Sequence, residues 1–322
     1  MKSFIRVMAV LLVFSIFSLA LVSCGNEDTY VIGISQQQPH VALDTATEGF
    51  KQALIDRFGE DKVTFETQNA QGEPSTCVTI ANNFVSKNVD LIMANGTSAL
   101  QAAANATTTI PILGTSITEY SVALNLENFN GTVGGNISGT SDLAPLEEQA
   151  QMILDLFPEA KNVGLLYCSA EPNSKYQVEG VKAYLEQRGI VCTEYTFSDS
   201  NDISLVAERA SDESDVIYIP TDNTAATCTG TIDNIVRPKK VPIIAGEEGI
   251  CSGCGVAAFS ISYYEIGYKT GEMAADILEG KADISTMAIE YDPNPVKKYN
   301  KEICEELGIS IPDGYTAIEV GE

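Results

Sequence analysis

The stretch Asp215-Val216-Ile217-Tyr218-Ile219-Pro220-Thr221-Asp222-Asn223-Thr224 joins an apolar run to a polar turn. Residues 216–220 are rich in β-branched and aromatic side chains, which is typical of a strand buried on both faces of a parallel sheet. The Thr-Asp-Asn-Thr that follows favours a turn and the start of a helix. Because open α/β sheets bind ligands beyond the carboxyl ends of their strands, this stretch predicts one edge of a ligand site.

The same alternation of strand and helix recurs in both directions along the chain. Helical periodicity is clearest at 43–58 and 263–278. A loose region rich in Asn and Gly, at 119–142, divides the alternation into two series. Apolar runs that predict strands lie at 29–35, 62–67, 89–93 and 110–113, and then at 162–167, 190–197, 216–220, 241–245 and 256–261. The pattern predicts an α/β protein with two Rossmann-like lobes, each built on a parallel sheet, whose strand ends face each other.

The N-terminal residues have the composition of a signal peptide. Lys2 and Arg6 precede an apolar run at 7–22, and the run ends in Leu-Val-Ser-Cys at 21–24. This ending resembles the bacterial lipobox, in which the cysteine receives lipid and becomes the new N-terminus. We therefore expect a lipid anchor on Cys24; a plain signal peptide with an incidental cysteine is the alternative. No later stretch is long and apolar enough to span a bilayer.

The net charge and the spacing of the cysteines indicate which partners, nucleic acid or metal, the protein is not expected to bind. The formal net charge of −25 argues against nucleic acid as a partner. Cys251-Ser252-Gly253-Cys254 has CxxC spacing, but it lacks a second pair and a nearby histidine, so we expect a Gly-rich turn with structural thiols or a local disulfide there, and no metal. Seven cysteines, an odd number, remain after Cys24, and the sequence leaves their pairing open: Cys77, Cys168, Cys192, Cys228, Cys251, Cys254 and Cys304.

Polar side chains follow the predicted strands of both lobes. Hydroxyl groups and free backbone N–H groups at helix starts suit a carboxylate, whereas acidic side chains suit an ammonium group. Each such residue also fits the simpler role of a helix cap, although Asp222 and Asn223 offer two cappers where one suffices. The candidate ligand-binding residues are Gln38, His40, Thr97, Ser98, Thr115, Ser116, Asn173, Ser174, Thr221, Asp222, Asn223 and Glu247.

The sequence offers few of the residues and motifs that catalysis usually requires. His40 is the single histidine, so the chain has little material for a Ser-His-Asp triad or a histidine-based metal site. No GxGxxG follows the first strand, and neither GxxxxGK[ST] nor GxSxG occurs. We therefore expect no catalytic residues and no cofactor. Pairs of carboxylates are too numerous to exclude a hydrolase by count alone.

Several motifs, taken in order, resemble one family. They are the lipobox, Pro39-His40-Val41-Ala42-Leu43-Asp44, Ala94-Asn95-Gly96-Thr97, Ile137-Ser138-Gly139-Thr140-Ser141-Asp142 and Tyr218-Ile219-Pro220-Thr221-Asp222-Asn223-Thr224. Together they look like the substrate-binding lipoproteins of ABC transporters with a type I two-lobe fold. The subgroup associated with tryptophan and other aromatic amino acids is the closer match. The similarity extends from about residue 29 to about residue 280.

The resemblance implies a hinge of crossing strands, near 139–143 and 260–263, with a ligand cleft between the lobes. It also divides the chain into segments. We expect a signal peptide at 1–23, a lipid-anchored linker at 24–28, a first lobe at 29–141 plus about 262–285, a second lobe at 142–261, and a C-terminal segment at 286–322 that is assigned to neither lobe.

The resemblance further implies a function. We expect a monomer, lipid-anchored on the outer face of the cell membrane, that captures a small solute by hinge closure and delivers it to an ABC permease. The solute is expected to be an amino acid, and the subgroup points to an aromatic one. Asp222 would hold its ammonium group, and Thr97, Thr115 and Ser116 its carboxylate. A ligand-sensing ectodomain with the same fold and a hydrolase remain as alternatives.

Overall fold

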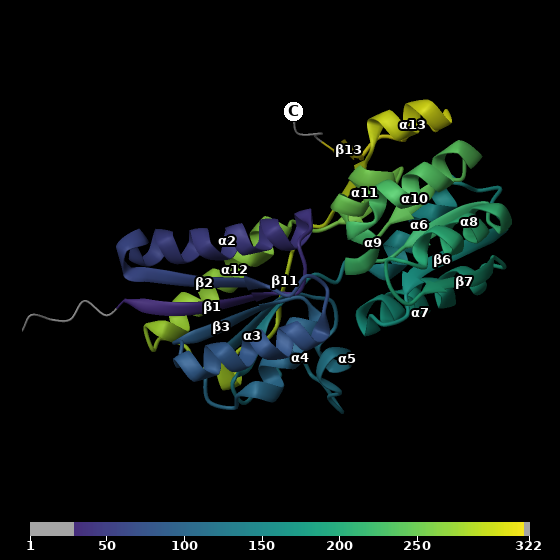
Figure 1. Ribbon diagram of the computed structural model, residues 1–322. Helices are drawn as coiled ribbons and strands as arrows, with labels where there is room; N and C mark the ends of the chain where they lie inside the picture. Colours follow the sequence, from purple (N-terminus) through teal and green to yellow (C-terminus); the bar gives the residue numbers. More distant parts are fainter. Residues whose placement is uncertain (1–28, 319–322) are drawn as a thin grey trace, which may run out of the picture.

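The computed structural model describes residues 29–318 as two α/β lobes placed side by side (Figure 1). Residues 1–23 and Cys24, for which we predict a signal peptide and a lipid anchor, lie outside the described residues. Within 29–318, no helix combines the length and the apolar composition needed to cross a membrane.

The first lobe is built on a sheet in which every recorded strand pair is parallel, with the strand order β11-β5-β4-β3-β1-β2. Its strands are β1 (Tyr30–Gln36), β2 (Val63–Asn69), β3 (Leu91–Asn95), β4 (Ile112–Ile117), β5 (Ile137–Ser141) and β11 (Glu290–Tyr291). Its helices are α2 (Val41–Phe58), α3 (Pro74–Lys87), α4 (Thr97–Ala106), α5 (Tyr120–Leu124) and α12 (Tyr263–Leu278), with the short turns η1 (Glu60–Lys62) and η3 (Ile284–Thr286).

The second lobe repeats this plan with the strand order β13-β12-β10-β9-β8-β6-β7. Its strands are β6 (Asn162–Cys168), β7 (Val191–Phe197), β8 (Val216–Ile219), β9 (Ile243–Ala245), β10 (Ala257–Ser260), β12 (Val296–Tyr299) and β13 (Thr316–Ala317). Its helices are α6 (Leu146–Leu156), α7 (Pro172–Glu186), α8 (Ile203–Glu213), α9 (Asn223–Thr227), α10 (Thr229–Val236), α11 (Glu248–Cys254) and α13 (Lys301–Leu307), with the turn η2 (Arg237–Lys239). β12 pairs antiparallel with β10, while the other recorded pairs are parallel.

Helices cover both faces of each sheet, so the central strands are buried on both sides. In the first lobe, α2 and α12 lie together over one face, and α3 and α4 cover the other (Figure 1). Strand β8, the apolar run from which the sequence argument begins, is fully buried. The predicted fold of two lobes with largely parallel sheets is therefore confirmed.

Glycines allow α2 and α12 to pack very closely. A β-carbon added to Gly267 would lie 2.0 Å from the Ala46 carbonyl oxygen, and one added to Gly49 would lie 2.2 Å from the Tyr264 carbonyl oxygen. The two backbones therefore touch at points where any side chain would separate them. This contact fixes the start of α2 against the start of α12, at the edge of the lobe that faces its partner.

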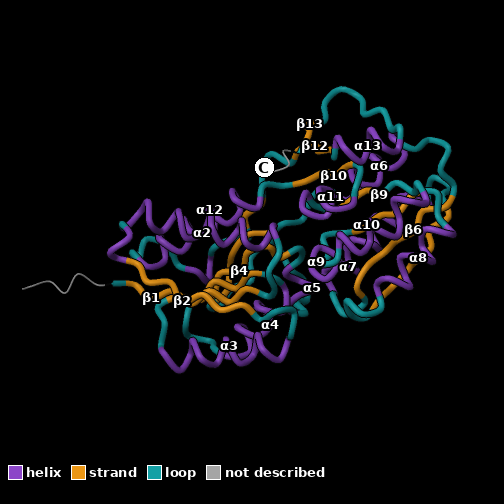
Figure 2. Tube along the Cα trace, turned by 45° about the horizontal axis from the view of Figure 1, so that its top comes forward, coloured by secondary structure: helices purple, strands orange, loops and turns teal. Residues whose placement is uncertain are grey.

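The chain crosses between the lobes three times: after β5, between β10 and α12, and between β11 and β12. The third crossing was not expected, because the segment at 286–322 carried no assignment to either lobe. In the structure β11 completes the first sheet, whereas β12, α13 and β13 belong to the second lobe. Figure 2 shows loops joining the strands of the two lobes.

Two short helices lie where the sequence predicted loops. α5 interrupts the loose region at 119–142, and α11 contains the CxxC motif. The predicted Gly-rich turn at Cys251–Cys254 is therefore wrong, because Glu247 caps a helix that starts at Glu248. Cys251 and Cys254 are both buried and free; the five other cysteines of the described residues are also free, and two of them, Cys192 and Cys228, are only partly buried.

Candidate functional site

Side chains from the two lobes meet across the seam at the carboxyl ends of the sheets. The Gln38 side chain donates a hydrogen bond to the backbone carbonyl of Asn223, and His40 Nε2 lies 3.1 Å from Asn223 Oδ1. Asn223 Nδ2 donates to a carboxylate, so Asn223 Oδ1 is left as the acceptor and His40 Nε2 carries the hydrogen. Burial lowers the pKa of His40, so the imidazole is neutral near pH 7. We call these three residues the latch.

Glu171, which the sequence argument missed, holds the latch in place. One carboxyl oxygen accepts from the backbone N–H and the side-chain amide of Asn223, at 3.0 and 2.7 Å. The other accepts from the backbone N–H and the hydroxyl of Thr224, at 2.8 and 2.7 Å. Glu171 comes just before Pro172 at the start of α7, and that position alone predicts only a helix start.

Asp222 and Glu247 each begin a helix. Asp222 accepts from the backbone N–H groups of Cys168, at 2.7 Å, and Ala225, at 2.8 Å. Glu247 accepts from Gly249 N–H at 2.6 Å and from Ile250 N–H.

Both carboxyl groups are almost fully buried, which makes their charged forms costly. Burial, and then the neighbouring Glu171 carboxyl, raise the pKa of Asp222, and burial raises the pKa of Glu247 to about 7. The helix cap, which was the simpler alternative for these residues, accounts for both oxygens of Glu247 and for Oδ1 of Asp222, while Oδ2 of Asp222 binds the end of β6.

The other predicted residues of the second lobe surround the end of β8. The Asn173 side-chain amide donates to the Thr221 carbonyl at 3.1 Å, while its Oδ1 has no partner. The Ser174 hydroxyl lies 3.5 Å from the same carbonyl. The structure thus brings Asn173, Ser174, Thr221, Asp222 and Asn223 together in one cluster.

The predicted ligand-binding residues of the first lobe do not form one cluster in the same way. The Thr115 hydroxyl lies 3.2 Å from the Thr140 hydroxyl, inside the same lobe. Ser116 sits in a left-handed backbone conformation, with φ of 55°, and its buried hydroxyl has no partner. Thr97 is buried at the start of α4, and the Ser98 backbone N–H donates to Gln37 rather than remaining free.

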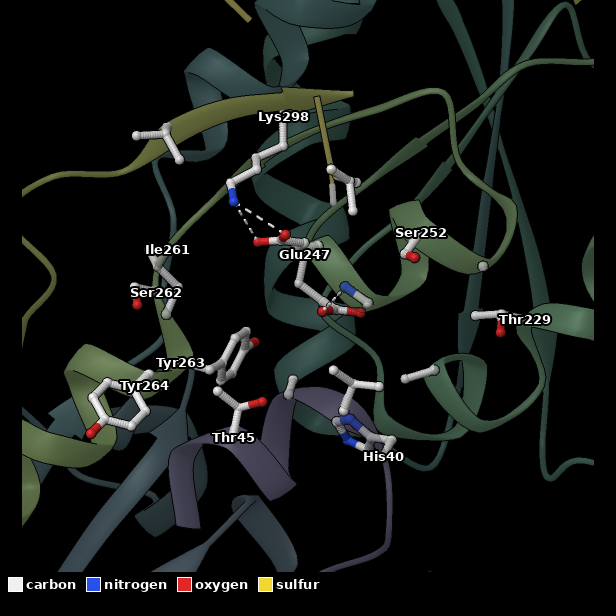
Figure 3. A pocket seen from close by; sticks show the side chains of 18 of the residues that line it. His40, Thr45, Thr229, Glu247, Ser252, Ile261, Ser262, Tyr263, Tyr264 and Lys298 are labelled. Atoms are coloured by element: carbon white, nitrogen blue, oxygen red, sulfur yellow. Dashed lines mark hydrogen bonds and ion pairs between the residues drawn. The ribbon is translucent and has the colours of Figure 1, made fainter. Parts of the chain in front are cut away.

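A cavity of about 600 Å³ lies in the seam between the lobes. Figure 3 shows His40 on one side, Glu247 and Lys298 on the other, and Tyr263 and Tyr264 along the wall. Six aliphatic side chains, two tyrosine rings and nine polar or charged side chains line it, so the cavity offers both apolar contact and hydrogen-bonding groups to a small organic molecule. Because both lobes contribute walls, a ligand bound there would stabilise this arrangement of the lobes.

Tyr263 connects the cavity to the hinge. It is the first residue of α12, directly after the crossing from β10, and its hydroxyl donates to Asp142 Oδ2 at 3.0 Å. Asp142 follows β5 at another crossing. This hydrogen bond therefore joins two of the three connections between the lobes.

No metal centre is evident in the part of the chain that the structure describes. Among residues 29–318, no group of three or more His, Cys, Asp or Glu side chains is placed to hold a metal ion. The buried thiols are also poor ligands, because burial raises the pKa of Cys251 well above its ordinary value.

Comparisons with known proteins agree on one family. The family model described as ABC transporter substrate binding protein matches residues 31–318. A curated relative, the tyrosine-binding protein of Clostridioides difficile, is 38% identical over 253 residues, which cover 78% of this chain and 73% of the relative.

Two solved structures superpose on this chain to different extents. A domain from Streptococcus pneumoniae in complex with L-Trp is 30% identical, covers 90% of this chain and 100% of its own, and superposes with a TM-score of 0.85. The ligand-free, open structure of a substrate-binding protein with adhesive properties from Clostridium difficile is 34% identical, with coverage of 91% and 100%, but its TM-score is 0.70. Despite its lower identity, the ligand complex superposes better on this chain than the open, ligand-free structure does.

The two-lobed fold, the seam lined from both sides and the match over residues 31–318 lead to one assignment. This chain belongs to the ABC transporter substrate-binding protein family, whose members bind solutes outside the cytoplasm for an ABC importer rather than catalyse a reaction.

Proposed function

We propose that this protein captures an aromatic L-amino acid between its lobes and delivers it to an ABC permease. The carrying observation is the seam itself, where a cavity of about 600 Å³ is lined from both lobes by tyrosine, aliphatic and polar side chains. An aromatic amino acid matches this combination, because its ring needs apolar contact and its two charged groups need buried partners. The curated relative is named for tyrosine, and the pneumococcal domain holds L-Trp.

Closure of the lobes is the step that captures the ligand. The latch of Gln38, His40 and Asn223 joins side chains of the first lobe to a residue of the second, so it forms only when the two lobes meet. A ligand that contacts both lobes stabilises this closed state in proportion to its greater affinity for it. Of the predicted residues, His40 and Glu247 line the cavity itself.

The experiment is a titration of the purified protein with L-tryptophan. The chain contains no tryptophan, so red-edge excitation reports the ligand's indole alone. We expect saturable binding of L-tryptophan, displaced by L-tyrosine and L-phenylalanine, and none of the same strength by L-leucine or myo-inositol. A ligand at a hundred times its Kd should stabilise the fold by about 2.7 kcal/mol. Absence of saturable binding by all three aromatic amino acids would overturn the proposal.

We further propose that the mature protein is a monomer tethered to the cell membrane by lipid on Cys24. The Leu-Val-Ser-Cys motif at 21–24 supports this, together with the function of the family outside the cytoplasm. Labelled fatty acid should enter the wild-type protein but not Cys24→Ser, and the variant should leave the membrane fraction. Equal labelling of the two proteins would exclude this anchor.

A further inference from the structure

Four carboxyl side chains in the described residues are more than nine-tenths buried, and all four lie at the seam or the hinge. They are Asp142, Glu171, Asp222 and Glu247, with exposures of 4%, 7%, 1% and 2%. A buried carboxylate is costly unless hydrogen bonds or a positive charge compensate it. No lysine or arginine forms a recorded ion pair with any of the four. The hydrogen bonds that each carboxyl oxygen accepts therefore show which of the four side chains lacks a partner.

Three of the four have both oxygens occupied. Glu171 accepts four hydrogen bonds from Asn223 and Thr224. Asp222 and Glu247 each accept one backbone N–H on each oxygen. Since these bonds hold helix starts, they would have to break before the same oxygens could turn to a ligand.

Asp142 is different. Its Oδ2 accepts from the Tyr263 hydroxyl, while its Oδ1 is buried and has no hydrogen-bond partner. The hydroxyls of Thr118 and Tyr263 favour the charged form of this carboxyl, and Asp142 in turn raises the pKa of another buried carboxyl, Glu247. An unpartnered, acceptor-only oxygen in a negative environment is suited to a cationic donor.

The position of Asp142 links it to the cavity in the seam. Its backbone N–H donates to the Ile117 carbonyl, directly after Ser116 at the end of β4. Tyr263, which bonds the other oxygen, lines the cavity in the seam. Asp142 is thus one side chain away from the cavity, and the strand end that its backbone meets carries a second buried polar atom without a partner, Ser116 Oγ.

We infer that Asp142 accepts the ammonium group of the ligand, and that Asp222, the residue expected from the sequence, instead caps a helix. This inference rests on the proposed function, because it concerns the same amino-acid ligand. Ser116 Oγ is then available to donate to the carboxylate, and Asn173 Oδ1 is a second free acceptor in the other lobe. In the absence of a ligand cation, burial raises the pKa of Asp142 to about 6, which agrees with a site that lacks its positive partner.

The test compares ligands that differ only in their charged groups. Wild-type protein and Asp142→Asn are titrated with L-tryptophan, with tryptamine, which keeps the ammonium group, and with indole-3-propionate, which lacks it. In the variant we expect the Kd of L-tryptophan and tryptamine to rise about tenfold to a hundredfold, while that of indole-3-propionate changes little or falls. The preference for the amine should therefore collapse.

Asp222→Asn is the matched comparison, because it makes the same chemical change at the carboxyl expected from the sequence. It should lower stability by weakening a helix start, yet keep the wild-type preference for the amine over the des-amino ligand. If Asp142→Asn does not fold, Asp142→Ser also removes the carboxyl group and tests whether the preference for the amine is lost.

The outcomes separate the two claims. An unchanged preference for the amine in Asp142→Asn, or its loss in Asp222→Asn, overturns this inference and leaves the proposed function intact. Failure of the wild-type protein to bind any aromatic amino acid overturns both.

Discussion

At the scale of single residues, Glu171 stabilises the seam more than its place in the sequence indicates. Replacing Glu171 with Ala would leave the buried N–H groups of Asn223 and Thr224 without an acceptor. We expect the free energy of unfolding to fall by about 2–3 kcal/mol in denaturant titrations. Glu179→Ala is the control, because Glu179 is exposed on the same helix and its ion pair with Lys175 should contribute under about 1 kcal/mol. Equal losses in the two variants would contradict this role.

Glu247 should make the stability of the unliganded protein depend on pH. Burial raises its pKa from 4.5 to about 7, so between these values the folded state holds a proton that the unfolded chain has released. Its contribution to stability is therefore fully present below about pH 4.5 and is lost as the pH rises towards about 7.

Glu247→Gln should be less stable at every pH, because an amide offers one acceptor oxygen where two N–H groups donate. Its free energy of unfolding should nevertheless decline less between about pH 5 and about pH 7 than that of the wild type, in urea titrations without ligand. Glu265→Gln, at an exposed site, should follow the wild-type curve. Parallel curves for wild type and Glu247→Gln would refute the titration.

The residue scale also shows where sequence reasoning about the site ends. Polar residues after parallel strands are recognisable from their pattern, and the structure gathers Asn173, Ser174, Thr221, Asp222 and Asn223 at one place. Whether an oxygen is free or already bonded depends on distant backbone groups. Cys168 N–H, for example, lies 54 residues from its acceptor Asp222. No local pattern contains that information.

At the scale of elements, alanine substitution should have opposite effects at a glycine in the contact between α2 and α12 and at a glycine with open space around it. Gly267→Ala would place a methyl group 2.0 Å from the Ala46 carbonyl oxygen, so we expect a loss of about 3 kcal/mol. Gly230, in α10, has open space at the same position, so Gly230→Ala should gain about 0.5–1 kcal/mol from helix propensity. Denaturant titration of both variants checks the sign, and a change in the same direction would contradict the packing argument.

Buried elements are the ones that the sequence predicts well. Strands β1, β3, β4 and β8 are apolar runs covered on both faces, and each was expected within a few residues of its bounds. α11 was missed because a short helix containing two glycines depends on its cap, Glu247, rather than on periodicity. β12 was missed because Val296–Tyr299 includes two lysines and lies between β10 and the short strand β13, near the edge of its sheet.

At the scale of the whole molecule, the latch predicts how long the ligand stays bound. His40→Ala removes one hydrogen bond across the seam and leaves the cores of both lobes intact. We expect L-tryptophan to dissociate about fivefold to tenfold faster in stopped-flow fluorescence, with association little changed. In solution scattering without ligand, the variant should have a larger radius of gyration than the wild type.

Gln52→Ala is the control for the latch, because Gln52 is exposed further along the same helix. It should match the wild type in both measurements. A dissociation rate in His40→Ala equal to that of the control would show that the latch does not hold the lobes together.

Three passages of the backbone between the lobes have a consequence for how the protein can be divided. The first sheet takes β11 from residues 290–291, and its face is covered by α12, so no uninterrupted piece of the gene encodes that half. A fragment that stops at residue 141 would expose the apolar surface of α2 that α12 covers. Reporter insertion or split-protein designs should therefore cut inside surface loops of one half, and a single nick at any one connection would leave both halves tethered by the remaining two.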